Sequence, residues 1–253
     1  MKARTFVLTI LLLAAATCAY AADLPTAEEI LAKVTAAWGA MKSYEADQQV
    51  GVVLQPNMTV TTTANTVMER SEKDGKTVEK FSIAEESVRR ATDGKDEVSE
   101  SRIVSDGTFR WRERRFPGDI GLRVWKDNAE NTPIGLQFNG LFPGSALDWK
   151  DYHLKTVGED TIDGQKMYVL EGTIDPTALV KGLKESKMKV WVRQADFIIR
   201  KRVLTMQGAD EDKPMVFTME FLNVKVNEKV DPALFVYTPP EGAKIIDHTQ
   251  PAK

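Results

Sequence analysis

The sequence contains little of the chemistry on which most enzymes depend. Its 253 residues include only two histidines and one cysteine. Zinc sites are built from histidine, cysteine and carboxylate ligands, so the lack of two imidazoles at ligand spacing argues against a zinc site of the usual kind. The sequence also lacks a phosphate-binding loop, a nucleophile elbow and a His-Glu-x-x-His motif. We therefore expect a protein that is not an enzyme and that uses no metal or cofactor.

The single cysteine, Cys18, lies in a segment typical of a secretory signal peptide. Basic residues precede an apolar run from Phe6 to Ala16, and Ala19-Tyr20-Ala21 fits a cleavage site. The run is too short to span a bilayer comfortably. We predict that residues 1–21 are a signal peptide cleaved after Ala21, which places the protein in the periplasm.

Lipidation of Cys18 is the less favoured alternative. A lipobox has a bulky aliphatic residue and a small residue where this chain has Ala15 and Thr17. Simple cleavage leaves a mature protein without cysteine, which excludes disulfides and thiolate catalysis. We expect residues 22–253 to form one domain, because their length suits a single large β domain.

The mature chain begins with a predicted amphipathic helix from Asp23 to Met41. Thr26 and Glu29 fit a capping box, in which each side chain satisfies a backbone N–H group of the other residue. The apolar residues that recur at helical spacing are Ile30, Leu31, Val34, Trp38 and Met41. A helix packed on a core is the plainer interpretation of this pattern.

From Ser43 onward the apolar residues alternate, which predicts strands. The clearest are Tyr44–Leu54, Met58–Glu69 and Thr77–Ala84, and later hairpins turn at Asp106-Gly107 and Asp163-Gly164. A short helix is predicted at Asp175–Ser186. Because most connections have hairpin length, we predict about eleven antiparallel strands. A sheet of this size must curl, so the expected fold is a mainly β half barrel with short helices on its concave face.

A row of large apolar side chains marks the strand that follows Pro214. Its members, Met215, Phe217, Met219 and Phe221, alternate with other residues and therefore share one face. Ordinary core is the plainer interpretation. Methionines interleaved with phenylalanines also make an adaptable surface of the kind that accepts ligands of variable shape. After Phe221 the apolar parity shifts, which predicts either a bulge near Leu222-Asn223 or a strand that is buried on both sides.

The strand after Asp106-Gly107 carries aromatic and basic residues on opposite faces. Phe109 and Trp111 share one face, and Arg110, Arg112 and Arg114 share the other. Interleaved basic and aromatic residues can bind nucleic acid, but a net charge of −3 and export argue against that partner. We interpret the arginine row as a solvated face that docks an acidic partner.

An apolar, glycine-containing segment lies between Phe116 and Trp149. Its apolar residues include Leu136, Phe138, Leu141 and Phe142. An exposed patch of this kind would promote association, so the segment is expected to pack as a short helix or to form a lid.

Three stretches resemble the periplasmic outer-membrane lipoprotein carriers, the LolA-like family. The first is Ile103 to Trp111, with a Val-Ser-Asp-Gly hairpin followed by Trp. The others are Asn131 to Trp149, similar to the family's helical insert, and Val230 to Gly242, which ends in Thr-Pro-Pro-x-Gly. The family's basic residue after the early strands is matched by Arg70. The proline that often follows it is missing, so we interpret Arg70 as an exposed turn arginine.

The resemblance implies a monomeric periplasmic carrier that shelters lipoprotein acyl chains in an apolar cavity under a helical lid. It also implies an inner-membrane ABC-type release complex and an outer-membrane acceptor as partners. The cavity that it implies is lined by Ile30, Leu31, Val34, Trp38, Met41, Phe109, Trp111, Leu136, Phe138, Leu141, Phe142, Met215, Phe217, Met219 and Phe221.

Two other functions fit the same resemblance. The fold also serves as the sensing domain of periplasmic regulators that bind an anti-sigma factor, although those regulators carry a second domain that we do not expect here. A carrier of free lipid or glycolipid is the other alternative.

The signal peptide generates the first prediction. We expect the mature N-terminus at Ala22, with no lipid attached, because Ala19-Tyr20-Ala21 suits cleavage better than Cys18 suits lipidation. Intact mass of the protein from its own periplasm measures this. A mass that includes a diacylated Cys18 would contradict the prediction and indicate a membrane-anchored protein.

Overall fold

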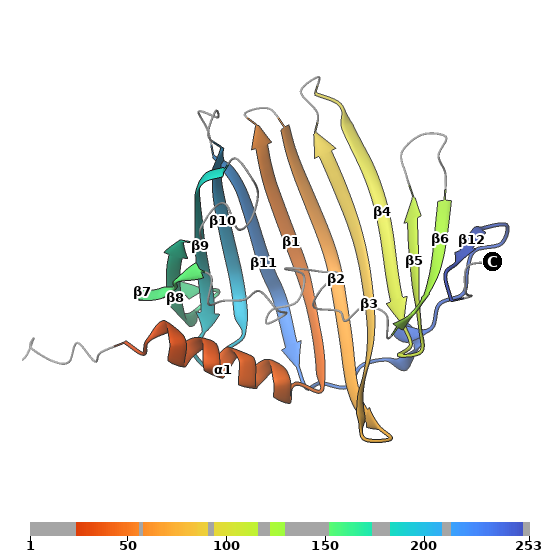
Figure 1. Cartoon of the computed structure of the whole chain (residues 1–253), viewed down its shortest axis with the longest axis horizontal. Helices are drawn as coiled ribbons and strands as arrows, with labels where there is room; N and C mark the ends of the chain where they lie inside the picture. Colours follow the sequence, from red (N-terminus) through yellow and green to blue (C-terminus); the bar gives the residue numbers. More distant parts are fainter. Residues whose placement is uncertain are drawn as a thin grey trace, which may run out of the picture.

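The computed structural model describes residues 24–55, 58–90, 94–115, 122–129, 152–173, 183–208 and 214–249. Within these ranges twelve strands form a single open, curved sheet, and one α-helix packs against it (Figure 1). The elements are α1 Ala27–Ala40, β1 Ser43–Gln55, β2 Met58–Lys73, β3 Lys76–Arg90, β4 Asp96–Ser105, β5 Phe109–Arg115, β6 Leu122–Asn128, β7 Lys155–Ile162, β8 Gln165–Thr173, β9 Leu183–Arg193, β10 Ile199–Gly208, β11 Met215–Val226, the 3-10 helix η4 Pro232–Phe235, and β12 Lys244–Asp247.

The strand order shows that a strand near the start of the chain pairs with a strand near its end. It runs β12-β6-β5-β4-β3-β2-β1-β11-β10-β9-β8-β7, so β1 pairs with β11 in the middle of the sheet (Figure 1). The predicted antiparallel pairing is confirmed for these strands, except that β12 pairs in parallel with β6. This short strand brings the number to twelve, where about eleven were predicted.

Helix α1 begins with the predicted capping box. Thr26 Oγ1 accepts a hydrogen bond from the Glu29 backbone N–H at 3.2 Å, and the Glu29 carboxylate accepts one from the Thr26 backbone N–H at 2.9 Å. The helix runs across the sheet at the ends of β9, β10 and β11 (Figure 1). Ile30 and Val34 project from it into the core and are almost fully buried.

The sheet has two different faces. We call the face against which α1 packs the helix face. Its core includes Leu170, Val190 and Phe221 beneath α1, and a neighbouring cluster contains Tyr44, Met68, Phe81, Ile83 and Ile103. We call the opposite face the tail face. There Val67 packs against Val230 and Phe235 from the segment after β11.

The predicted bulge in β11 is confirmed. Glu45 pairs with Lys225 but Asp47 pairs with Leu222, so β11 has one residue more than β1 across this interval. Asn223 adopts φ 51°, a left-handed conformation that asparagine tolerates better than most residues. Its side chain donates a hydrogen bond to Asp47 at 2.8 Å, and the bulge explains the shift in apolar parity after Phe221.

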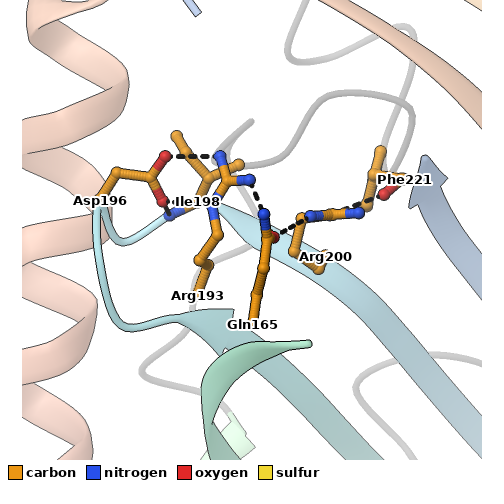
Figure 2. A network of polar contacts seen from close by, with 6 residues as sticks. All are labelled: Gln165, Arg193, Asp196, Ile198, Arg200 and Phe221. Carbon is orange, nitrogen blue, oxygen red and sulfur yellow. Dashed lines mark hydrogen bonds and ion pairs between the residues drawn. The ribbon is translucent and has the colours of Figure 1, made fainter. Parts of the chain in front are cut away.

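A polar network ties four strands together beside the core (Figure 2). The buried Arg200 Nε donates to the Phe221 carbonyl at 2.8 Å, and its Nη1 donates to Gln165 Oε1 at 2.6 Å. Gln165 Oε1 also accepts from Arg193 Nη1 at 3.1 Å, and Arg193 forms two hydrogen bonds with Asp196. The network therefore links β8, β9 and β10 to β11 at the backbone of Phe221.

One sequence-based expectation was wrong, and others concern residues outside the described ranges. The short helix predicted at Asp175–Ser186 is contradicted at its end, because Leu183 already begins β9. The signal peptide and the apolar insert with Leu136, Phe138, Leu141 and Phe142 lie outside the described residues.

Candidate functional site

The Met/Phe row divides into a core residue and a more accessible part. Phe221 is 1% exposed and packs in the core beneath α1. Met215, Phe217 and Met219 lie farther along β11 on the same face and are half-buried. Only these three therefore belong to a surface that a ligand can reach without displacing core.

Neighbouring strands widen this surface. On β10, Leu204 pairs with Phe217 and Met206 with Met215. On β1, Val50 pairs with Met219 and Val52 with Phe217. Paired residues share a face, so these side chains form one surface with the row. We call it the apolar patch, and it comprises the half-buried residues Val50, Val52, Leu204, Met206, Met215, Phe217 and Met219.

A buried cation borders the apolar patch toward α1. Arg202 pairs with Met219, donates to its sulfur at 3.5 Å and lies over the Phe221 ring at 5.5 Å. Its residue surface is 4% exposed, and this burial lowers the pKa of Arg202 to about 10. The guanidinium thus remains protonated at neutral pH, at the boundary between the helix-covered core and the patch.

The helix residues predicted to face a ligand lie instead at the interface between α1 and the sheet. Ile30, Val34 and Met41 are at most 3% exposed, and Leu31 is partly buried against the same core. Trp38 packs edge-on against Tyr44, with their ring centroids 5.9 Å apart. These contacts fasten α1 and match the plainer interpretation of the helix.

The interpretation of Arg70 as an exposed turn arginine was wrong. Arg70 lies within β2, and its side chain is 15% exposed. Its guanidinium donates to the Trp38 carbonyl at 2.5 Å, lies 5.0 Å from the Trp38 ring and pairs with Glu79 at 2.6 Å. A cation at the C-terminus of a helix is favourable for the helix dipole, so Arg70 anchors that end of α1.

The arginine row lies on the helix face, and its interpretation as a solvated face is contradicted for Arg110. Phe81 of the helix-face core pairs with Ser105, and Ser105 pairs with Arg110. Arg110 is only 3% exposed. Arg112 is half-buried, and only Arg114 is exposed.

Phe109 and Trp111 consequently lie on the tail face. Trp111 stacks on Tyr237 with a centroid distance of 5.4 Å, and Lys126 lies 4.0 Å from the Phe109 ring centroid. The prediction that both aromatics line one cavity with the Met/Phe row is therefore contradicted. The alternation was correct, but the face assigned to each set of side chains was reversed.

Asp127 on β6 connects the arginine row to the end of the chain. Its carboxylate lies 3.3 Å from both Arg110 Nη2 and Arg112 Nη2 and 2.9 Å from His248 Nδ1. Burial acts to raise the pKa of Asp127, but the hydrogen bond with His248 and the charges of Arg112 and Arg110 together hold it below its ordinary value. Asp127 is therefore ionised and stabilises the buried Arg110.

The described residues contain no group of three or more histidine, cysteine, aspartate or glutamate side chains that could hold a metal ion. Among the described helices, none is both long and apolar enough to cross a membrane.

Known proteins provide a separate comparison. A family model described as "Predicted periplasmic protein (DUF2092)" matches residues 145–248. An outer-membrane lipoprotein carrier protein of Salmonella paratyphi B is 27% identical over 148 residues, which cover 58% of this chain and 61% of that protein. An uncharacterized protein of Methanocaldococcus jannaschii is 35% identical over 107 residues, which cover 42% of this chain and 27% of that protein.

Among solved structures, LprF from Mycobacterium bovis matches with a TM-score of 0.45 and 13% identity, over 81% of this chain and 94% of that chain. The chain spans less than two thirds of the length of the lipoprotein carrier and of the Methanocaldococcus jannaschii protein. The match to the lipoprotein carriers confirms the resemblance to the LolA-like family that the sequence motifs indicated.

Asp127 generates a prediction about stability and pH. Asp127→Asn removes the carboxylate that Arg110 and Arg112 share, so at pH 7 the free energy of unfolding should fall by about 2–3 kcal/mol. A carboxylate with a depressed folded-state pKa stabilises the fold above its unfolded-state pKa of about 3.9, and this contribution is lost as the pH falls through the folded-state pKa. The difference between wild type and variant should therefore shrink below about pH 4.

Urea denaturation at pH 7 and at acid pH measures this difference. Asp96→Asn is the control, because Asp96 pairs with Arg90, whose side chain is 63% exposed. That variant should lose much less stability than Asp127→Asn, because the pair is exposed to solvent. Equal losses in the two variants, or a loss at Asp127 that does not change with pH, would contradict the role given to Asp127.

Proposed function

We propose that the protein is a periplasmic carrier that binds the acyl chains of lipoproteins or of other lipids on the helix face of its sheet. The observation that carries this proposal is the apolar patch, in which seven half-buried side chains from β1, β10 and β11 share one face beside the helix-covered core. The named lipoprotein carrier among the relatives supports the same class of ligand. The periplasmic description of the matching family model supports the location.

The composition of the apolar patch suits a carrier. Each methylene group that an acyl chain removes from water contributes about 0.8 kcal/mol, so a modest length of chain gives useful affinity. Met206, Met215 and Met219 are unbranched and adjust to chains of different shape. A surface that adapts in this way binds many acyl chains with moderate affinity, and moderate affinity permits release.

Transport between membranes extends this proposal. The carrier would take acyl chains at an inner-membrane ABC-type release complex and pass them to an outer-membrane acceptor. The family resemblance supports both partners. The shuttle uses no cofactor, since apolar burial drives binding and the partner complexes drive transfer.

A pair of substitutions tests the apolar patch. Phe217 pairs with Val52 and Leu204 on the helix face, whereas its neighbour Thr218 pairs with Gly51 and Val203 and lies on the tail face. Phe217→Glu introduces a charge where an acyl chain would exclude water, so it should reduce binding of a fluorescent fatty acid by at least about tenfold. Thr218→Glu adds the same charge to the other face and should bind nearly as wild type.

Fluorescence titration measures binding, and circular dichroism checks that both variants fold. A folded Phe217→Glu protein that binds normally would show that the patch does not hold the chain. Unfolding by Phe217→Glu alone would return the row to the interpretation as ordinary core.

A further inference from the structure

A second hollow lies on the helix face, away from the apolar patch. It has a volume of about 460 Å³ and lies over β3, β4, β5 and β6. It is lined by Glu85, Ser101, Ile103, Arg112, Glu113, Arg114 and Trp125. We call it the arginine pocket.

Strand pairing explains how these side chains meet. Arg112 pairs with Ile103 on one side and with Trp125 on the other, while Arg114 pairs with Ser101 and Arg123. The Arg112 guanidinium lies 5.7 Å from the Trp125 ring centroid. The pocket thus places two guanidinium groups beside an apolar wall made by an indole and an isoleucine.

The balance of charge around the pocket is positive. Around the pocket, the described residues Arg110, Arg112, Arg114 and Arg123 outnumber the carboxylates Asp127, Glu85 and Glu113. Asp127 is already shared between two of these arginines and His248. Glu85 accepts a hydrogen bond from Ser101 Oγ at 2.5 Å.

The two arginines that line the pocket are accessible. The Arg112 side chain is 40% exposed, and Arg114 is exposed. Planar guanidinium groups match the oxygen pairs of phosphate and carboxylate, and such charge-assisted hydrogen bonds are stronger than neutral ones. The chemistry of the pocket therefore suits an oxyanion attached to an apolar body.

The arginine pocket and the apolar patch lie on the same face of the sheet. Met219 on β11 and Arg112 on β5 are five strand spacings apart, about 24 Å across the sheet. Ala64 and Ile83 lie on the helix face of the intervening strands β2 and β3 and are apolar. Both are buried, so the apolar surface that a lipid bound at the pocket meets first is the pocket wall formed by Ile103 and Trp125.

We infer that the arginine pocket binds the phosphate of an anionic lipid headgroup whose acyl chains leave the pocket along the wall formed by Ile103 and Trp125. This inference rests on the proposed function and refines it, because it selects phosphate-bearing lipids among those with acyl chains. The acyl chains supply affinity through burial, and the arginines supply discrimination between headgroups.

Calorimetric titration with three probes tests the inference. Dioctanoyl phosphatidic acid and dioctanoylglycerol differ only in the phosphate, and glycerol phosphate carries the phosphate without chains. The wild-type protein should bind phosphatidic acid at least about tenfold more tightly than dioctanoylglycerol, because the guanidinium groups form charge-assisted hydrogen bonds with the phosphate. Glycerol phosphate should bind far more weakly, and the preference should decline as salt rises.

Substitutions show which residues produce the preference for phosphatidic acid. Arg112→Gln combined with Arg114→Gln should abolish the preference for phosphatidic acid while leaving dioctanoylglycerol binding unchanged. Arg114→Gln alone, at an exposed position, keeps the pair between Arg112 and Asp127 and should reduce the preference several-fold even if the double variant folds poorly. Arg90→Gln combined with Arg115→Gln removes the same charge from the tail face and should behave as wild type.

The outcomes separate the two proposals. Equal binding of both dioctanoyl lipids by the wild-type protein, or an unchanged preference in both pocket variants, overturns the headgroup site and leaves the acyl-chain proposal standing. Glycerol phosphate binding as tightly as phosphatidic acid also overturns it, in favour of a small-anion site. If neither dioctanoyl lipid binds, the acyl-chain proposal itself is overturned.

Discussion

The pairing of β11 with β1 is the constraint on which the rest of the structure depends. This register decides which side chains face α1, and a slip of one residue would exchange the two faces of the strand. The bulge at Asn223 absorbs the extra residue in β11, and the hydrogen bond from Arg200 to the Phe221 carbonyl fixes the neighbouring backbone. Through unbroken pairing from β1 to β5, the same register sets the orientation of the arginine row.

One face of the sheet consequently combines three environments. The core beneath α1 is closed, and Arg70 anchors the end of the helix at the Trp38 carbonyl. Beside it the apolar patch presents adaptable, half-buried side chains. Farther across the sheet the arginine pocket presents positive charge, which Asp127 partly balances. This order of closed core, apolar surface and cationic pocket suits an amphiphile, because each part of such a ligand meets a matching environment.

Local signals were predictable from the sequence, and long-range ones were not. The capping box at Thr26, the turn at Asp106-Gly107 and the parity shift after Phe221 depend on neighbouring residues, so the sequence was sufficient for each. Alternation separated Arg110 from Trp111, but it could not show which of them faces α1, because that choice depends on pairing through β2, β3 and β4. The partners of Phe217 on β1 and β10 were missed for the same reason, although each is itself part of an alternating strand.

Native mass spectrometry of the protein purified from its own periplasm tests the central claim, that the helix face carries a lipid, most directly. The account predicts a population heavier than the mature chain by the mass of an acyl-containing molecule, which gentle activation releases and fragmentation identifies. A phosphate-bearing lipid would agree with the full account. Protein that carries only its own mass when purified under conditions that retain lipid on a known carrier, or that carries a ligand without acyl chains, would contradict it.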